Sequence, residues 1–304
     1  EMLLRAHAEL LSQNQVVSGI IEEIITINEV FNLLPFVGVN GKAYLYKREN
    51  VNAQPTVVFL NDNEDVPESS GQFTEVITKL RILIGDVDVD NFLRETMSDT
   101  EDQIGLQLAM KAKAMGRQFM ASMVTGDNVA RPKEFDGLRA LVDANASQVI
   151  PRATNGGGLT LDVLDQLVDT VPNKPDFLMM RSGTRRAYLA QLRLAGGNDG
   201  AMLQLPQFGK PILTHAGVPI LVNDFLPGNE TLGSGTNLCS VYAVRANEMD
   251  GVHGLYGGTS AGIRVEDIGT VQNRDAVRTR LKWYCGMALK STRSVARLSG
   301  ITNI

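Results

Sequence analysis

The sequence predicts an α+β fold in which one domain is interrupted by a smaller α/β unit. Three stretches of the 304 residues carry this prediction. Residues 98–125 have the pattern of a long amphipathic helix, residues 141–261 alternate between strand and helix patterns, and residues 277–290 alternate apolar with polar side chains. The last strand needs partners outside the α/β unit, and residues 73–97 supply them most economically. The domain that holds the long helix is therefore discontinuous in sequence.

The long helix is predicted to begin at Ser98, where Glu101 completes the S-x-x-E pattern of a capping box. At about 1.5 Å per residue it would span roughly 40 Å, which is long for a globular protein. Gly126 is expected to end it in a left-handed conformation. Apolar side chains recur every three or four residues along one face, namely Ile104, Leu108, Ala112, Met115, Phe119 and Met123.

The first quarter of the chain lacks the apolar sequence to close a core of its own. Residues 1–39 combine helical turns with an extended apolar segment and are predicted to be an arm. Residues 43–48 alternate in the manner of a strand, residues 56–60 are expected to return as its partner, and an acidic loop at residues 61–72 follows this hairpin. A lone hairpin is marginal in water, so we expect it to lean on a partner. A hairpin folded back onto its own domain is the alternative.

The α/β unit and the tail contain a regular series of shorter elements. We count the final apolar segment as part of the tail, which we expect to pair with strands outside residues 141–261. The predicted elements are a helix from Thr160, a buried strand at 177–180, a helix at 182–194, a hairpin at 212–222, a flexible loop at 229–236, a central strand at 238–244, a strand at 263–268 and an apolar segment at 294–301.

Composition excludes several classes of function. The net charge of −5 is opposite to that of a typical nucleic-acid binder, and no apolar run approaches the roughly 20 residues of a membrane span. The three histidines are far apart in sequence, and Cys239 and Cys285 belong to no C-x-x-C motif, so no metal is expected and both thiols should be buried and free. Asp86, Asp88 and Asp90 resemble part of a calcium loop, but glycine and glutamate are missing from its later positions. A half-exposed strand is the better interpretation.

One sequence motif raises the possibility of an enzyme. Residues 258–262 match the G-x-S-x-G nucleophile elbow around Ser260. That elbow requires a following helix and a later histidine, whereas residues 263–268 read as a strand and every histidine precedes the serine. A turn of small residues is therefore preferred. We expect no catalytic residue, no cofactor and no membrane partner.

Charge divides into two opposite patches that could register subunits against one another. Residues 274–297 are strongly basic and residues 61–68 are acidic. A solvated surface explains either patch equally well, and the basic one could also contact DNA phosphates without sequence preference.

Four segments together resemble the major capsid proteins of tailed bacteriophages with the HK97 fold. They are LLPFVGVNGKAYLYKREN at 33–50, ESSGQFTEVITKLRILIGDVDVDNFL at 68–93, GDNVARPKEFDGL at 126–138 and LKWYCGMALKSTRSVARLSGI at 281–301. These segments are spread over nearly the whole chain, and their number and order make the resemblance specific. The start at Glu1 suits family members whose N-terminal scaffolding segment is cleaved.

The resemblance implies a division of the chain into named parts. It implies an N-arm at 1–39, an extended β-hairpin or E-loop at 40–75, a peripheral domain at 76–140 and 262–304 with its spine helix at 98–125, and an inserted α/β axial domain at 141–261.

It also implies a structural protein that assembles as hexamers and pentamers into an icosahedral head around double-stranded DNA. Copies of the chain are the expected partners, with portal, scaffold and decoration proteins as further candidates, and the virion, assembled in the host cytoplasm, is the expected location. An encapsulin nanocompartment around cargo enzymes is the alternative, and a hydrolase that uses Ser260 is a more distant one. The candidate intersubunit contacts are Tyr44, Tyr46, Lys47, Arg48, Phe59, Asp62, Glu64, Asp65, Glu68, Arg278, Arg280, Lys282 and Arg293.

Overall fold

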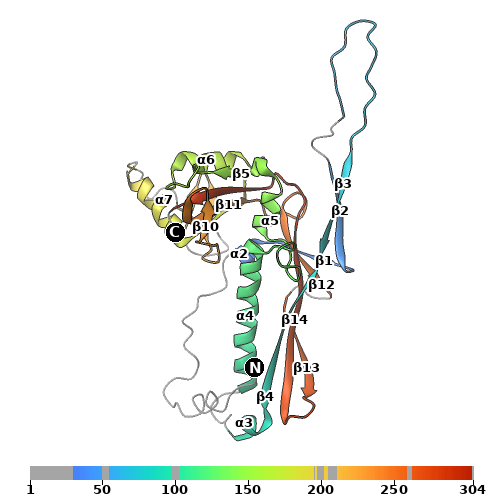
Figure 1. The fold of residues 1–304 in the computed structure, drawn as a ribbon, viewed down its shortest axis with the longest axis vertical. Helices are drawn as coiled ribbons and strands as arrows, with labels where there is room; N and C mark the ends of the chain where they lie inside the picture. Colours follow the sequence, from blue (N-terminus) through green and yellow to red (C-terminus); the bar gives the residue numbers. More distant parts are fainter. Residues whose placement is uncertain are drawn as a thin grey trace.

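The computed structural model describes an elongated molecule with a long helix along one side and a projecting hairpin at one end (Figure 1). The α/β unit lies beside the upper end of the helix in that view. The described residues are 30–49, 55–96, 103–194, 196, 202–204, 211–258 and 262–302.

The secondary structure contains most of the predicted helices and strands. The helices are α2 (Val30–Leu33), α3 (Asn91–Thr96), α4 (Gln103–Thr125), α5 (Leu138–Asp143), the 3-10 turn η2 (Ala146–Gln148), α6 (Leu161–Asp169) and α7 (Ser182–Leu194). The strands are β1 (Phe36–Val39), β2 (Ala43–Glu49), β3 (Phe73–Lys79), β4 (Arg81–Asp90), β5 (Val149–Pro151), β6 (Phe177–Met180), β7 (Met202–Gln204), β8 (Pro211–His215), β9 (Val218–Val222), β10 (Glu230–Leu232), β11 (Gly235–Val244), β12 (Val252–Gly257), β13 (Arg264–Thr270), β14 (Ala276–Leu289) and β15 (Val295–Ile301).

Helix α4 packs against a five-stranded sheet in which β14 is the longest strand. β14 pairs antiparallel with β4 over ten residue pairs, so the expected pairing of residues 73–97 with the tail is confirmed. Phe119 of α4 lies with its ring centroid 4.5 Å from that of Trp283 on β14. Met115, Phe119 and Met123 are buried, and the three earlier apolar positions of the helix pack against the same cluster. The predicted apolar face of the helix is therefore confirmed, while its predicted start at Ser98 lies outside the described residues.

The end of α4 is closed by close backbone contact, and the expectation of a left-handed Gly126 is wrong. Gly126 is not among the residues with positive φ. Its N–H donates to the Ser122 carbonyl at 2.8 Å, and its carbonyl accepts from the N–H of Gly137 at 2.9 Å. A Cβ at this position would lie 2.3 Å from the Phe135 carbonyl oxygen. Glycine is needed here for space rather than for its range of φ.

The α/β unit is built on an eight-stranded sheet of order β5-β15-β11-β6-β9-β8-β7, with β10 paired to β11. Helices α6 and α7 pack against this sheet, and every residue of β6 and β15 is buried. The predicted bounds of β6 and α7 are confirmed. The predicted β8–β9 hairpin is also confirmed, because Ala216 and Gly217 both take the positive φ of a two-residue turn.

Two expectations for this unit are wrong. Residues 229–236 are not a loop, because β10 folds back onto β11 through a turn at Gly233, whose φ is +57°. Polar sequence concealed this short hairpin. The segment at 294–301 does not pair with strands outside residues 141–261 but lies as β15 between β11 and β5, inside the α/β sheet. In addition, β12 belongs to the predicted unit 141–261 but pairs with β14 in the five-stranded sheet. Each sheet therefore contains one strand from the segment that forms most of the other.

The projecting hairpin is made of strands different from the predicted pair. β2 pairs with β3 from Ala43↔Lys79 to Glu49↔Phe73, and residues 56–60 form no strand. The observed register places apolar Leu45 opposite Ile77 and basic Lys47 opposite acidic Glu75, both favourable cross-strand pairs. The loop between the strands is therefore longer than expected.

Candidate assembly surfaces

The root of the hairpin is fixed to the body by three side chains of β2. The hydroxyl of Tyr46 donates to the Leu289 carbonyl at 2.7 Å. Arg48 donates to the same carbonyl at 2.6 Å and through Nε to the Lys290 carbonyl at 2.8 Å. The ring of Tyr44 packs edge-on against His253 of β12. Of the predicted intersubunit candidates, Tyr44, Tyr46 and Arg48 thus have partners within the chain. Lys47, on the opposite face of the strand, is exposed.

Beyond its root the hairpin has no cover from the described part of its own chain. All described residues from 55 to 75 are exposed, and the loop extends far beyond the body (Figure 1). The side chain of Phe59 is fully exposed, Val57 is 92% exposed, and Val66 is 74% exposed. The predicted acidic candidates Asp62, Glu64, Asp65 and Glu68 lie on the same loop and are exposed as well. Apolar side chains gathered on a projecting segment are typical of surfaces that bind another molecule.

The five-stranded sheet of β1, β4, β12, β13 and β14, which we call the long sheet, carries a ladder of ion pairs on the face turned away from α4. Arg278 donates twice to Asp88, both at 2.7 Å, and Arg280 donates twice to Asp86 at 2.7 and 2.8 Å. These hydrogen bonds, from Arg280 and Arg278 respectively, hold the pKa values of the Asp86 and Asp88 carboxyls below their ordinary range. Lys282 pairs with Glu266 of β13.

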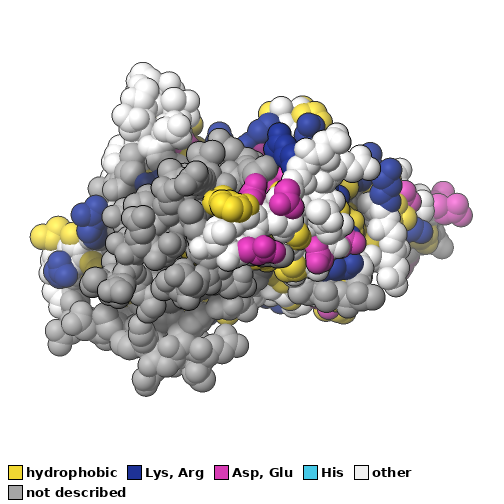
Figure 2. Space-filling view, turned by 90° about the horizontal axis from the view of Figure 1, so that it is seen from below, with side chains coloured by type: hydrophobic (Ala, Val, Ile, Leu, Met, Phe, Trp, Pro, Cys, Tyr) yellow, Lys and Arg dark blue, Asp and Glu magenta, His cyan; other side chains and the backbone are white. Residues whose placement is uncertain are grey.

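The cations Arg278, Arg280 and Lys282 are therefore neutralised inside the chain, which counting the charges of residues 274–297 could not reveal. Arg293 is exposed. Exposed apolar residues Ile82 and Ile84 continue the same face of β4 beyond the ion pairs. Seen along the long axis, acidic, basic and hydrophobic side chains lie interspersed over the described part of the surface (Figure 2).

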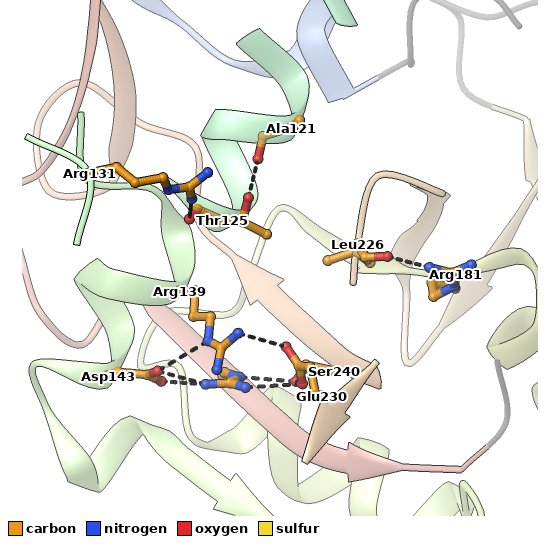
Figure 3. Close-up of polar contacts among 10 residues, drawn as sticks. Ala121, Thr125, Arg131, Arg139, Asp143, Arg181, Leu226, Glu230 and Ser240 are labelled. Carbon is orange, nitrogen blue, oxygen red and sulfur yellow. Dashed lines mark hydrogen bonds and ion pairs between the residues drawn. The ribbon is translucent and has the colours of Figure 1, made fainter. Parts of the chain in front are cut away.

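A buried polar cluster joins α5 to β10, β11 and β15. Arg297 donates to both oxygens of Asp143 at 2.7 Å, to Glu230 at 3.1 Å and to the Ser240 hydroxyl at 3.0 Å. Arg139 lies 3.7 Å from Asp143 and from Glu230 (Figure 3). The cluster lines a surface hollow of about 470 Å³.

This cluster connects the segment that follows the long helix with the α/β sheet. Arg297 and Glu230 are both buried, so each supplies the other's counter-charge where water cannot. Sequence reasoning missed it because Arg297 was counted as part of a surface patch. The one available signal was its place in a run of otherwise apolar residues.

Other titratable groups have structural partners. His215 Nε2 lies 2.9 Å from Asp165, and its Nδ1 lies 3.1 Å from the Tyr188 hydroxyl, which joins β8 to α6 and α7. Cys239 and Cys285 are buried thiols outside any disulfide, as predicted, and burial raises the pKa of the Cys285 thiol to about 12. Among the described residues, no group of His, Cys, Asp and Glu could hold a metal ion, and no helix has the length and apolar character to cross a membrane.

The serine motif does not have the structure of a nucleophile elbow. Ser260 itself lies outside the described residues. The elements on either side are strands, with β12 ending at Gly257 and β13 beginning at Arg264. A nucleophile elbow joins a strand to a helix, so the local topology disagrees with a hydrolase.

No protein-family model and no curated protein matches the chain. Solved structures do match it over nearly the full length. The holo-SrpI encapsulin complex from Synechococcus elongatus superposes with a TM-score of 0.75 at 19% identity, covering 99% of this chain and 96% of that one. The capsid of a native GTA particle gives a TM-score of 0.70 at 13% identity and covers 96% of each chain. A chain of Microbacterium phage Oxtober96 gives 0.66 at 16% identity and covers 98% of each.

The chain has the HK97 fold. The predicted α+β class and the predicted resemblance are thereby confirmed. The HK97 fold accounts for the discontinuous arrangement of the long helix, the long sheet and the α/β unit. At these identities the likeness concerns the fold.

Proposed function

We propose that this chain is a structural subunit that assembles with copies of itself into a closed shell. The observation that carries the proposal is the projecting hairpin, whose apolar loop residues have no cover from the described residues of the chain. Two strands alone are marginal in water, so such a hairpin gains most when a second molecule covers it. Repeated symmetric contacts of this kind can close into a shell although each one is weak.

The parts of the chain receive roles under this proposal. The hairpin, assigned to 40–75 and extended by the observed β3 to Lys79, is the E-loop that lies across a neighbouring copy. Residues 1–39 are the N-arm, and residues 76–140 and 262–304 are the peripheral domain, except that β15 lies in the α/β sheet. Residues 141–261 are the axial domain, except that β12 lies in the five-stranded sheet, and the axial loops gather at the centres of hexamers and pentamers. Phe59 and the acidic side chains near it are the contacts we expect to reach the neighbour. Tyr44, Tyr46 and Arg48 instead fix the orientation of the hairpin relative to the long sheet.

The more specific proposal is the head of a tailed bacteriophage that encloses double-stranded DNA. The shell would belong to the virion and assemble in the host cytoplasm. Contacts with DNA would be non-specific and would come from exposed cations such as Arg293, because Arg278 and Arg280 already have carboxylate partners. Portal, scaffold and decoration proteins are the expected further partners.

An encapsulin shell is the second candidate. It is favoured by one observation, which is that the encapsulin chain superposes with a higher TM-score than the GTA capsid. The two candidates differ in what the shell contains, DNA in one and a cargo protein in the other.

Electron microscopy of the purified protein, with absorbance at 260 and 280 nm on the same fraction, tests both. Closed shells with nucleic acid support the phage head, and closed shells with a co-purifying protein support the encapsulin. A small discrete oligomer under all conditions would contradict both.

A further inference from the structure

The hairpin root rests on one face of the long sheet, opposite the face that packs on α4. Val39, Leu255 and Ala288 form a small buried cluster there, and Tyr44 and Tyr46 of the hairpin pack against it. His253 belongs to the same face, because it pairs with Ala288 across β12 and β14. A titratable ring is therefore part of the apolar seat of the hairpin.

His253 is completely buried in this seat. Its ring centroid is 5.6 Å from that of Tyr44, with the two planes at 83°. Tyr44 is also contacted by the Lys290 ammonium, whose Nζ lies 5.9 Å from the Tyr44 ring centroid. A second positive charge on His253 would thus form beside an existing one, with little water to screen it.

The charges around His253 favour the neutral ring. Burial and then Lys290 lower its pKa, while the backbone of Gly251 and the carboxylate of Glu248 offset part of this shift. From the hairpin, β2 contributes the phenols of Tyr44 and Tyr46 and the guanidinium of Arg48. β1 contributes no titratable side chain.

We propose that His253 is a proton-sensitive joint that controls how firmly the hairpin is attached to the body. Protonation of the ring weakens the packing of Tyr44 and Tyr46 against the buried cluster, so that the hairpin can detach from the long sheet. The joint is a property of the single chain. Its consequence for assembly rests on the proposed function, since the hairpin is the element that reaches the neighbouring copy.

The direction of the effect follows from linkage. When the seat opens, the His253 ring meets water and its pKa returns towards the ordinary value of about 6.5. The open form then binds the proton more tightly than the closed form. Attachment is therefore strongest above about pH 6.5 and weakens as the pH falls below it, by at most about tenfold per pH unit for one proton.

Hydrogen exchange of the unassembled full chain at pH 7.5 and 5.5, corrected for intrinsic rates, tests the joint. Once detached, a two-stranded hairpin is marginal, so exchange in β2 and β3 reports the opening. We expect their protection to fall by up to about tenfold at pH 5.5, and protection in β6 to stay constant. His253→Gln should abolish the pH response. His215→Gln, which changes a buried histidine of β8 away from the hairpin root, should retain it.

Lys290→Gln provides a second variant should His253→Gln not fold. Removing the ammonium raises the pKa of His253 in the closed form, so the response should shrink but remain. The proposal is wrong if β2 and β3 of the wild type are equally protected at both pH values, or better protected at pH 5.5. Electron microscopy of the wild-type chain is independent of this outcome. Shells with a pH-insensitive root leave the proposed function standing, and a pH-sensitive root without shells leaves the joint standing.

Discussion

The hairpin and the α/β unit use the same kind of apolar strand in opposite ways. In the α/β unit, every residue of β6 and β15 is buried under helices and neighbouring strands of the same chain. In the hairpin, Phe73 is 72% exposed and Ile77 is 55% exposed. One region closes its core alone, whereas the other presents apolar surface that nothing in the described chain covers. Under the proposed function, folding and assembly depend on different segments, and substitutions can separate them.

The largest effect on folding is expected where the α/β sheet buries charge. Arg297→Leu leaves Glu230 buried without its main counter-charge and should lower the free energy of unfolding by about 3–5 kcal/mol. Urea unfolding followed by Trp283 fluorescence measures this. Arg293→Leu is the matched control, because Arg293 is exposed, and should change stability by less than about 0.5 kcal/mol. Equal effects of the two substitutions would contradict the described cluster.

A smaller effect is expected from the ion-pair ladder of the long sheet. Asp88→Asn removes the negative charge that pairs with Arg278 and one of the two oxygens that accept its hydrogen bonds. It should lower the free energy of unfolding by about 1 kcal/mol, since the pair is partly exposed. Because the folded-state pKa values of Asp86 and Asp88 are lowered, their contribution is complete above about pH 4 and is lost as the pH falls below it.

Acid titrations of the wild type and Asp88→Asn should accordingly converge at low pH. A double-mutant cycle with Arg278→Gln checks that the energy belongs to this pair. A coupling energy of zero would show that the two side chains do not interact in solution.

Local pattern predicted the elements whose partners are near in sequence or whose face is long. The six apolar positions of α4 and the β8–β9 hairpin are examples, because a 3.6-residue period and a two-residue turn are both encoded locally. The partners of β2 and β15 could not be predicted in the same way. Residues 56–60 and 73–79 have equally good strand patterns, and only the paired register distinguishes them.

The candidate contacts show the same limit. Exposure of Phe59 and the loop acids agrees with their predicted role, which still awaits a test. The prediction could not tell that Arg278 and Arg280 meet aspartates 190 and 194 residues away in the chain. The alternating Asp and Val residues at 86–90 predict a half-exposed strand with acidic side chains facing outward. Local sequence does not indicate that β14, with its arginines, lies beside this strand.

The smallest effect on folding and a large effect on assembly are expected at the hairpin tip. Phe59→Ser removes a fully exposed ring, so the free energy of unfolding should change by less than about 0.5 kcal/mol. The protein concentration needed for shell formation should rise by at least about tenfold if the ring is buried at an interface, which light scattering measures. Phe59→Leu is the matched control and should assemble more nearly as the wild type does. A Ser variant that assembles normally would exclude this side chain from the contact.

The claim that the hairpin carries assembly is tested most directly by electron microscopy of two proteins. One is the wild type, and the other is a variant in which Asn-Gly replaces residues 50–72. The replacement joins Glu49 to Phe73, which the register places opposite each other, so β2, β3 and the root should persist. We predict closed shells from the wild type, and a folded variant with unchanged unfolding that forms none. Normal shells from the shortened chain would contradict the claim that the hairpin carries assembly.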